Sequence, residues 1–378
     1  MALAGLYIHI PFCSVACHYC DFHFSTSLHS IDALVECIAE EMFLQKNYLP
    51  SPEIETVYLG GGTPSLLKKH HMDVLFNAIH KNFKLLPQAE ITLEANPDDI
   101  TKEKLSLWKN YDINRLSIGV QSFHDDELKY LNRIHTSKQN YQSVGMAQDA
   151  GFQNISIDLI YGIPLEKNHN KLQQSLRSAL ELNVQHISAY CLTIEPDTVF
   201  GRWLHSGKIS AADDTFQAEQ FVLIQNTLLQ QHYEQYEISN YAKPHYISKH
   251  NSNYWLDRPY LGVGPSAHSY NLHSRQYNIA NNELYIRQVK QHIIPAQIEL
   301  CTNTSKYNDY ILTRLRTKWG IDANEITKKF GIHFELINKK KIEEFMSEKM
   351  ISFDENVYRL TKEGMLIADH ITRAFFIV

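Results

Sequence analysis

Residues 9–22 have the sequence HIPFCSVACHYCDF. Three of the chain's six cysteines, Cys13, Cys17 and Cys20, lie here with the spacing C-x3-C-x2-C. They follow a short β-rich run that ends at Pro11, so we expect them in a loop that leaves a strand. Thiolates are soft ligands that select zinc, copper(I) or iron–sulfur clusters. A tight triplet of cysteines therefore indicates a metal site.

Several kinds of cysteine site do not fit this spacing. Structural zinc needs a fourth ligand, usually from a second C-x2-C pair or a histidine pair, and the other three cysteines are scattered singly along the chain. A redox C-x-x-C formed by Cys17 and Cys20 leaves Cys13 unexplained. No C-x-x-C-H motif for covalent haem attachment is present. The remaining interpretation is a cluster held by three cysteines, with one iron left without a protein ligand. Zinc, or simply buried cysteines, is the alternative.

The triplet, with the aromatic Tyr19 before its last cysteine, resembles the signature of the radical S-adenosylmethionine (SAM) family. The resemblance implies that the open iron chelates the amino and carboxylate groups of SAM. It also implies that the reduced cluster passes an electron to the sulfonium and releases a 5′-deoxyadenosyl radical. Under this hypothesis the chain carries two cofactors, a 4Fe–4S cluster and SAM.

The composition is that of an ordinary soluble globular protein, with 44% apolar and 21% charged residues among 378. Its length allows two domains, or one barrel with an appendage. A net charge of −6 argues against a general binder of nucleic acids or anionic membranes. No Lys or Arg precedes Lys46, which excludes the charged start of a signal peptide, and no apolar run approaches the roughly 20 residues that span a bilayer. Clustered cysteines suit a reducing compartment, so we expect a cytoplasmic metalloprotein.

Six β-rich segments alternate with segments of helical periodicity through the first half of the chain. We expect strands at 6–10, 55–59, 91–94, 115–120, 154–160 and 186–192, and helices between them at 30–46, 66–81, 102–109, 139–150 and 168–182. Such alternation predicts parallel β/α units with right-handed crossovers. Six strands are too few to close an eight-stranded barrel. The sequence therefore predicts an α/β fold, a partial (β/α)6 barrel within residues 1–240.

Polar motifs follow several of these strands, where parallel folds gather their chemistry. The loop GGGTPS (60–65) has glycines whose backbone can approach a polar ligand closely, with a plain tight turn as the alternative. Glu94 ends the third strand, although a solvated acid at a helix start is the alternative. Gln121 follows the fourth strand, and Arg133 is expected in the next helix. Asp158 lies in the fifth strand, where a buried acid needs a partner, and this favours a ligand contact.

The rest of the chain divides into two segments of different character. Residues 241–300 form a connecting region that contains HNSNYW (250–255), whose plain interpretation is core aromatics and a surface histidine. Residues 301–378 have helical patterns and a hairpin pattern, at 307–319, 323–330, 334–349 and 351–360. This order resembles a winged helix, often a DNA reader. However, 13 Lys or Arg against 11 Asp or Glu give it a net charge of only +2, so we expect a mostly helical, winged-helix-like domain that does not bind nucleic acid.

Nine motifs between residues 13 and 269 together resemble the oxygen-independent coproporphyrinogen III oxidase group of the radical SAM family, and the resemblance runs from residue 6 to about residue 366. They are CSVACHYCDF, GGGTPS, LEANPDD, RLSIGVQSF, ISIDLIYGIP, LTIEPDT, YEISNYA, HNSNYW and YLGVGPSAHS. The group has two branches. The oxidases carry a fourth cysteine, C-x3-C-x2-C-x-C, where this chain has Phe22. The HNxxYW motif belongs to the other branch, the haem chaperones, and is their proposed haem-binding site.

The resemblance assigns roles to individual residues. Cys13, Cys17 and Cys20 would ligate the 4Fe–4S cluster. The SAM amino group would be held by Gly61, Gly62 and Thr63, and SAM would be surrounded by Tyr7, Glu94, Gln121, Arg133 and Asp158. Haem would contact His250, Tyr254 and Trp255, because imidazole is a common axial ligand and aromatic side chains suit a flat macrocycle. His268 or another histidine is the alternative iron ligand.

Three functions are compatible with these features. The first is a haem chaperone that binds haem and passes it to an unidentified acceptor protein, with an electron donor serving the cluster. A membrane-associated acceptor is compatible with this function. The second is a coproporphyrinogen oxidase that decarboxylates propionates, against which Phe22 and the HNxxYW motif both count. The third is a radical SAM enzyme that modifies nucleic acid, which the charge of the C-terminal segment disfavours. We expect oxidase activity to be absent, whereas SAM cleavage is compatible with the cluster site.

Overall fold

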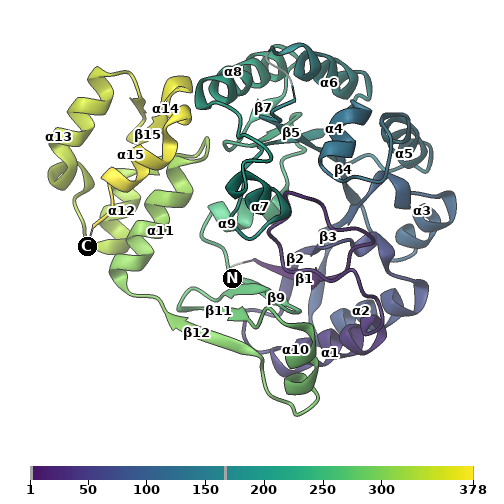
Figure 1. Cartoon of the computed structure of the whole chain (residues 1–378). Helices are drawn as coiled ribbons and strands as arrows, with labels where there is room; N and C mark the ends of the chain where they lie inside the picture. The colour runs from purple at the N-terminus through teal and green to yellow at the C-terminus, as the bar shows by residue number, and fades with distance from the viewer. Residues whose placement is uncertain (1–2, 166–167, 378) are drawn as a thin grey trace.

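The computed structural model describes residues 3–165 and 168–377. Six parallel strands lie side by side in sequence order, with helices around the outside (Figure 1). They are β1 (Ala4–Ile10), β2 (Glu53–Gly61), β3 (Lys84–Ala95), β4 (Arg115–Gln121), β5 (Ile155–Tyr161) and β6 (His186–Cys191). Each strand pairs in parallel with the next. The predicted α/β partial barrel is therefore confirmed.

Helices between these strands cover the outer face of the sheet. They are α1 (Ile31–Leu44), α2 (Lys69–Asn82), α3 (Lys102–Lys109), α4 (Asp125–Tyr130), α5 (Ser137–Asp149) and α6 (Asn170–Glu181). Helix α3 has the bounds that its periodicity predicts. The prediction that Arg133 lies within a helix is wrong, because α4 ends at Tyr130 and Arg133 lies in the loop before α5. None of the helices in the described part of the chain is long and apolar enough to cross a bilayer.

Strands at both edges extend the parallel core into a mixed sheet of twelve strands. Beyond β1 lie β9 (Tyr260–Val263), β10 (His268–Tyr270), β11 (Ser274–Asn278) and β12 (Ala296–Leu300). Strand β9 pairs in parallel with β1, and each later strand is antiparallel to the one before it. Beyond β6 lie the antiparallel strands β8 (Asn240–Ala242) and β7 (Glu234–Gln235). Much of the region 241–300 therefore contributes to the same sheet as the barrel.

The segments after β6 contain the helices α7 (Val199–His205), α8 (Asp214–Gln230), α9 (Lys249–Trp255) and α10 (Asn282–Val289).

A buried acid in α1 joins the edge formed by β9 to β12 to the barrel. Glu41 of α1 is completely buried and accepts hydrogen bonds from the Gly264 backbone N–H (2.8 Å), the Asn278 amide (2.7 Å) and the Tyr285 hydroxyl. A Cβ on Gly264 would lie 2.5 Å from the His9 carbonyl oxygen. Because buried polar groups must be hydrogen-bonded, the contact with Glu41 gives Gly264 of the motif YLGVGPSAHS a structural role.

The inner face of the parallel strands is polar. Buried side chains there include Thr56, Thr92, Arg115, Ser117 and His186. The apolar core lies instead between the strands and the surrounding helices. Closed eight-stranded barrels are usually filled by branched apolar side chains. A polar interior therefore points to a function in the barrel that packing alone does not require.

Residues 303–374 form a mostly helical domain with a hydrophobic core of its own. Its helices are α11 (Asn303–Leu315), α12 (Ala323–Phe330), α13 (Phe334–Ser347), α14 (Lys362–Leu366) and α15 (Ala368–Ala374). Its three-stranded sheet consists of β13 (Ile321–Asp322), β15 (Val357–Leu360) and β14 (Ile351–Asp354), in that order. The predicted helices and hairpin are confirmed. Figure 1 shows this domain, in yellow-green, beside α8 and beyond the end of β12.

Candidate functional site

A cavity of about 550 Å³ opens at the carboxyl ends of the parallel strands. Its walls come from the loop 11–25, which we call the cluster loop, and from the ends of β2 to β6. The residues predicted from sequence that line it are Cys13, Cys17, Cys20, Gly61, Gly62, Thr63, Glu94, Gln121, Arg133 and Asp158. Four other predicted residues do not line it: Tyr7, His250, Tyr254 and Trp255.

The cluster loop is held by the segment that follows α4. The backbone N–H of Cys13 donates to the Ser25 carbonyl (3.0 Å) and joins the two ends of the loop. Nη1 of Arg133 lies 3.4 Å from the Cys17 sulfur. The guanidinium of Arg133 therefore contacts the cluster loop at one of the three predicted cluster ligands.

The cluster loop brings the three predicted ligands to one cavity. Cys13, Cys17 and Cys20 all line it, and all three are free thiols. A cluster takes each thiolate on a different iron. Among the described residues, the one set of three ligand atoms within 4.8 Å of one another belongs to Asp32, His70 and His71. A 4Fe–4S cluster on the three cysteines therefore stays a prediction, with zinc as the alternative.

The glycine loop after β2 lies directly against the cluster loop. The backbone N–H of Gly62 donates to the Ile10 carbonyl (2.9 Å), and that of Thr63 donates to the Phe12 carbonyl (2.7 Å). A Cβ on Gly62 would lie 2.7 Å from both carbonyl oxygens. Gly61 has φ of 103°, and a Cβ there would lie 2.5 Å from a neighbouring imidazole. Both positions therefore require glycine.

Glu94 lies at the end of β3, next to the glycine loop. Its Oε1 accepts a hydrogen bond from the Tyr58 hydroxyl (2.7 Å), and its Oε2 accepts one from the Gly61 backbone N–H (3.1 Å). Burial raises the pKa of Glu94 to about 7, although both hydrogen bonds favour the carboxylate. The negative charge of Asp158 adds to the increase. A carboxyl group in a cavity with such a shifted pKa is a candidate for ligand binding.

Asp158 and Gln121 contribute the neighbouring part of the cavity wall. Ser117 Oγ lies 3.4 Å from the Asp158 carboxylate, and burial raises the pKa of Asp158 to about 6. Gln121 has φ of 65°, and the pairing of β4 with β5 shifts register just before it. Left-handed backbone is uncommon for a residue other than glycine and concentrates at functional sites. Here it occurs where β4 reaches the cavity.

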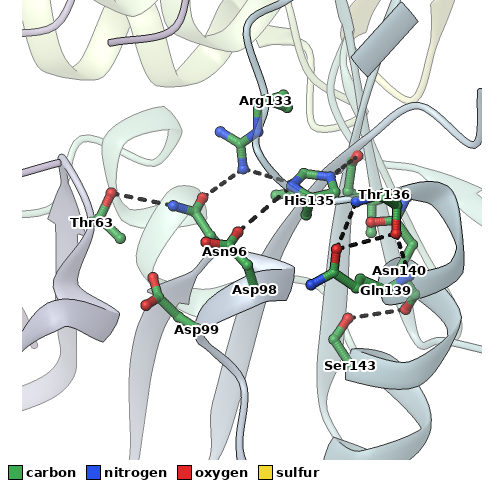
Figure 2. A network of polar contacts seen from close by, with 12 residues as sticks. Thr63, Asn96, Asp98, Asp99, Arg133, His135, Thr136, Gln139, Asn140 and Ser143 are labelled. Atoms are coloured by element: carbon green, nitrogen blue, oxygen red, sulfur yellow. Dashed lines mark hydrogen bonds and ion pairs between the residues drawn. The ribbon is translucent and has the colours of Figure 1, made fainter. Parts of the chain in front are cut away.

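Arg133 connects the cluster loop to the strand ends. Its Nη2 donates to Asn96 Oδ1 (2.6 Å) and to the Gly119 carbonyl (3.1 Å). The Asn96 amide nitrogen donates in turn to Thr63 Oγ1 (3.4 Å), so Asn96 lies between the glycine loop and the guanidinium (Figure 2). The sequence patterns did not identify Asn96 as a site residue. Its place directly after β3, beside the other strand-end residues, is the signal that marks it.

Tyr7 lies one layer behind the cavity. Its hydroxyl forms a hydrogen bond with His9 Nδ1 (3.0 Å). Its ring centroid is 6.1 Å from that of Tyr58 and 6.3 Å from that of His250. A direct contact between Tyr7 and SAM therefore stays a prediction.

The HNxxYW motif lies in α9, beside the amino-terminal halves of β1 and β2 and away from the cavity. His250 is 1% exposed, and its Nδ1 is hydrogen-bonded to the Thr56 hydroxyl (2.8 Å). Its Nε2 is hydrogen-bonded to the Tyr254 hydroxyl (2.9 Å). The Glu90 carboxylate accepts the His250 backbone N–H (2.9 Å), a favourable place for an acid at a helix start.

This environment keeps the His250 imidazole neutral and fully bonded. Burial, together with the charge of Arg115, lowers the pKa of His250 to about 3. Both ring nitrogens are engaged, so neither is free to bind iron in this conformation. Tyr254 and Trp255 are half-buried. Haem ligation by His250 stays a prediction, and it requires α9 to move.

Two family models match the chain. Residues 7–173 match the radical SAM superfamily, and residues 302–367 match the HemN C-terminal domain. The chain is 32% identical to the heme chaperone HemW of Bacillus subtilis, over 99% of both chains. It belongs to the HemW family. Within that family, the chain is also 32% identical to HemW of Lactococcus lactis, over 98% of this chain and 97% of the relative. HemW of Escherichia coli is 37% identical over 70% of this chain and 69% of its own.

A solved structure has the same fold as this HemW-family chain. Coproporphyrinogen III oxidase (HemN) from Escherichia coli, a radical SAM enzyme, superposes with a TM-score of 0.86. The match covers 99% of this chain and 90% of HemN, at 21% identity. Such a low identity shows the shared fold alone. It confirms the predicted barrel with an added C-terminal domain.

Proposed function

We propose that this chain is a haem chaperone, which binds haem and passes it to an acceptor protein while carrying a 4Fe–4S cluster and SAM. The observation that carries the proposal is the similarity to HemW chaperones along 99% of both chains. The cavity supports it, because the expected cluster and SAM residues gather there from six separate segments. A second candidate is coproporphyrinogen oxidase, because the chain has the same fold as HemN, although a shared fold does not by itself select the function.

We propose that Cys13, Cys17 and Cys20 hold the cluster. All three cysteines line one cavity, on a single short loop. A bound cluster would supply an electron and an iron with an open coordination position. Arg133, 3.4 Å from the Cys17 sulfur, would compensate part of the negative charge of the thiolates.

The SAM site is proposed between the glycine loop and the ends of β3 to β5. Gly61, Gly62 and Thr63 line the cavity and would hold the SAM amino group there. Glu94 and Asp158 offer carboxylates to a ligand that carries an ammonium and a sulfonium. Gln121 and Arg133 would contact it from the neighbouring walls, with Tyr7 behind them.

For haem, we keep the His250, Tyr254 and Trp255 motif as the proposed contact. Imidazole is a common ligand of haem iron, and the aromatic neighbours suit a flat apolar macrocycle. Binding through His250 would break its hydrogen bond to either Thr56 or Tyr254. The proposal therefore includes a displacement of α9 on haem binding.

The proposed partners are haem, a haem-acceptor protein and an electron donor for the cluster. A donor is needed because a cluster that reduces SAM must itself be reduced. The C-terminal domain is proposed to pack over the barrel and not to bind nucleic acid. Many of its cations are already paired, including Arg314 with Glu325 (3.6 Å) and Lys318 with Glu234 (2.7 Å).

Assays with coproporphyrinogen separate the two candidate functions. Phe22 replaces the fourth cysteine of the oxidases, and its side chain is 71% exposed at the cavity. We expect the anaerobically reconstituted protein, with SAM and a reductant, to leave coproporphyrinogen unchanged. Formation of protoporphyrinogen would overturn the chaperone proposal and favour the oxidase.

Haem titration of His250→Ala tests the proposed contact. We expect a weakened or shifted Soret band relative to wild type, because the variant removes the imidazole. His333→Ala is the matched control, since His333 is exposed and lies in the C-terminal domain. An unchanged Soret band and haem affinity in His250→Ala would exclude His250 as the ligand.

A further inference from the structure

The barrel interior contains a buried arginine, and two of its three guanidinium nitrogens have no hydrogen-bond partner. Arg115 begins β4 and is 1% exposed. Its Nε and Nη1 atoms are buried and have no hydrogen-bond partner. The hydroxyl of Thr92, its register partner on β3, is likewise buried and without a partner. A buried charge is costly unless opposite charge or hydrogen bonds compensate it.

Strand register places Arg115 one layer beneath the two carboxylates of the cavity. Arg115 pairs with Thr92, and Ser117, two residues further along β4, pairs with Glu94. Because side chains alternate along a strand, all four point to the same side of the sheet. Ser117 contacts Asp158 on that side, so it is the barrel interior. The guanidinium therefore lies below Glu94 and Asp158.

The histidine and tyrosine side chains that face Arg115 are neutral. Burial keeps the pKa of His186 far below its usual range and that of His250 near 3, and the Arg115 charge acts in the same direction. Burial also raises the pKa of Tyr58 and Tyr236 well above the usual value. Among the described residues, the buried carboxyl groups around this guanidinium are Glu90, which lies below it and is already hydrogen-bonded to the start of α9, Glu237, which lies near Tyr236, and Glu94 and Asp158, which line the cavity above it.

We infer that Arg115 is a positioning residue of the SAM site, whose buried guanidinium lies beneath Glu94 and Asp158 and balances their negative charge where they would receive the cationic SAM. The inference rests on the proposed SAM site. Burial alone favours the protonated acids, and Arg115 opposes it at both carboxyls. A protonated acid loses its attraction for a sulfonium and one of the lone pairs that could accept from an ammonium.

Other titratable groups around the two carboxylates do not replace Arg115. They are Tyr7, Cys13, Arg133, Tyr190 and Tyr254. Burial raises the pKa of each tyrosine, so these hydroxyls stay neutral. Arg133 acts on Asp158 but is already bonded to Asn96 and Gly119 and contacts the Cys17 sulfur.

The test compares SAM affinity across pH in reconstituted wild type, Arg115→Met and Arg115→Lys. For wild type, we expect the affinity to rise as pH increases through about 6 to 7, where the carboxyls ionise. For Arg115→Met, we expect the midpoint to move up by about one pH unit or more, with roughly five- to tenfold weaker binding at pH 7. Arg115→Lys keeps the charge and should keep the midpoint. Arg314→Met removes a cation from the C-terminal domain and serves as the control.

A purely structural role for Arg115 would change stability or cluster content without moving the pH midpoint. Far-UV circular dichroism and iron content therefore accompany each titration. An Arg115→Met midpoint within about 0.3 units of wild type would overturn the inference, since a tenfold change corresponds to one unit. Failure of wild type itself to bind SAM would instead refute the proposed SAM site.

Further variants cover the case in which the Arg115→Met protein does not fold. If Arg115→Met does not fold, Arg115→Gln provides a second neutral side chain with the same expected shift. If neither neutral variant folds, Arg115→Lys decides the question. An unchanged midpoint in the lysine variant supports a role for the charge, and a midpoint raised by about one unit contradicts it.

Discussion

Substituting Gly62 by alanine should damage the site through the backbone. The new Cβ would lie 2.7 Å from the carbonyl oxygens of Ile10 and Phe12, where normal contacts are about 3.5 Å or more. These carbonyls accept the Gly62 and Thr63 backbone N–H groups at 2.9 and 2.7 Å. Overpacking costs about 1–3 kcal/mol, and each weakened hydrogen bond costs about 0.5–1.5 kcal/mol. The sum is a destabilisation of roughly 2–6 kcal/mol, with the cluster loop displaced.

The assay is the free energy of unfolding in urea, followed by SAM affinity after cluster reconstitution. Gly145→Ala is the matched control, because Gly145 lies inside α5 and its Cβ would meet no atom within 4 Å. That variant should be more stable than wild type by about 0.5–1 kcal/mol, since glycine disfavours a helix interior. The reasoning is refuted if Gly62→Ala unfolds within about 0.5 kcal/mol of wild type and binds SAM normally.

Three further predictions concern the cluster, one buried carboxyl and the C-terminal domain. Serine at Cys13, Cys17 or Cys20 should abolish the absorption of the 4Fe–4S centre, whereas Cys37→Ser, Cys191→Ser and Cys301→Ser should keep it. Loss of the cluster in Cys191→Ser would contradict the assignment, since Cys191 also lines the cavity. In the cluster-free protein, the raised pKa of Glu94 stabilises the fold below the unfolded pKa of 4.5, and this stability is lost as pH rises through about 7. Glu94→Gln should remove about 3 kcal/mol of that decline, measured by urea unfolding between about pH 5 and 8, and an unaltered slope would refute the shifted pKa. The C-terminal domain should give no salt-dependent affinity for duplex DNA, because that affinity comes from cations that neutralise phosphates; submicromolar binding that weakens steeply with salt would contradict this.

Elements with strong local signals could be predicted from the sequence. Helices α3 and α12 have the predicted bounds, and both begin at a side-chain cap, on Thr101 and Asp322. The cysteine triplet and GGGTPS are equally local. Arg133 was misplaced in a helix because α4 is only one and a half turns long and its end leaves no periodic signal.

Features that depend on tertiary contacts could not be predicted. Asn96 reaches Arg133, 37 residues away in the chain, and no local pattern marks that contact. His250 belongs to the seven-residue segment KHNSNYW, which forms α9 and whose mostly polar composition is typical of the protein surface. It is buried because the barrel interior is itself polar and offers Thr56 as a partner. The burial of Arg115 could not be predicted either, because a charged residue at the start of a strand ordinarily faces solvent.

Haem titration into the protein that already carries its cluster tests the chaperone function most directly. We expect a saturable Soret band at about one haem per chain, with the iron and sulfide of the cluster retained. The protein would then hold haem and cluster together, as a chaperone with a radical SAM barrel must. Absence of saturable haem binding by the intact, cluster-loaded chain would contradict the central claim.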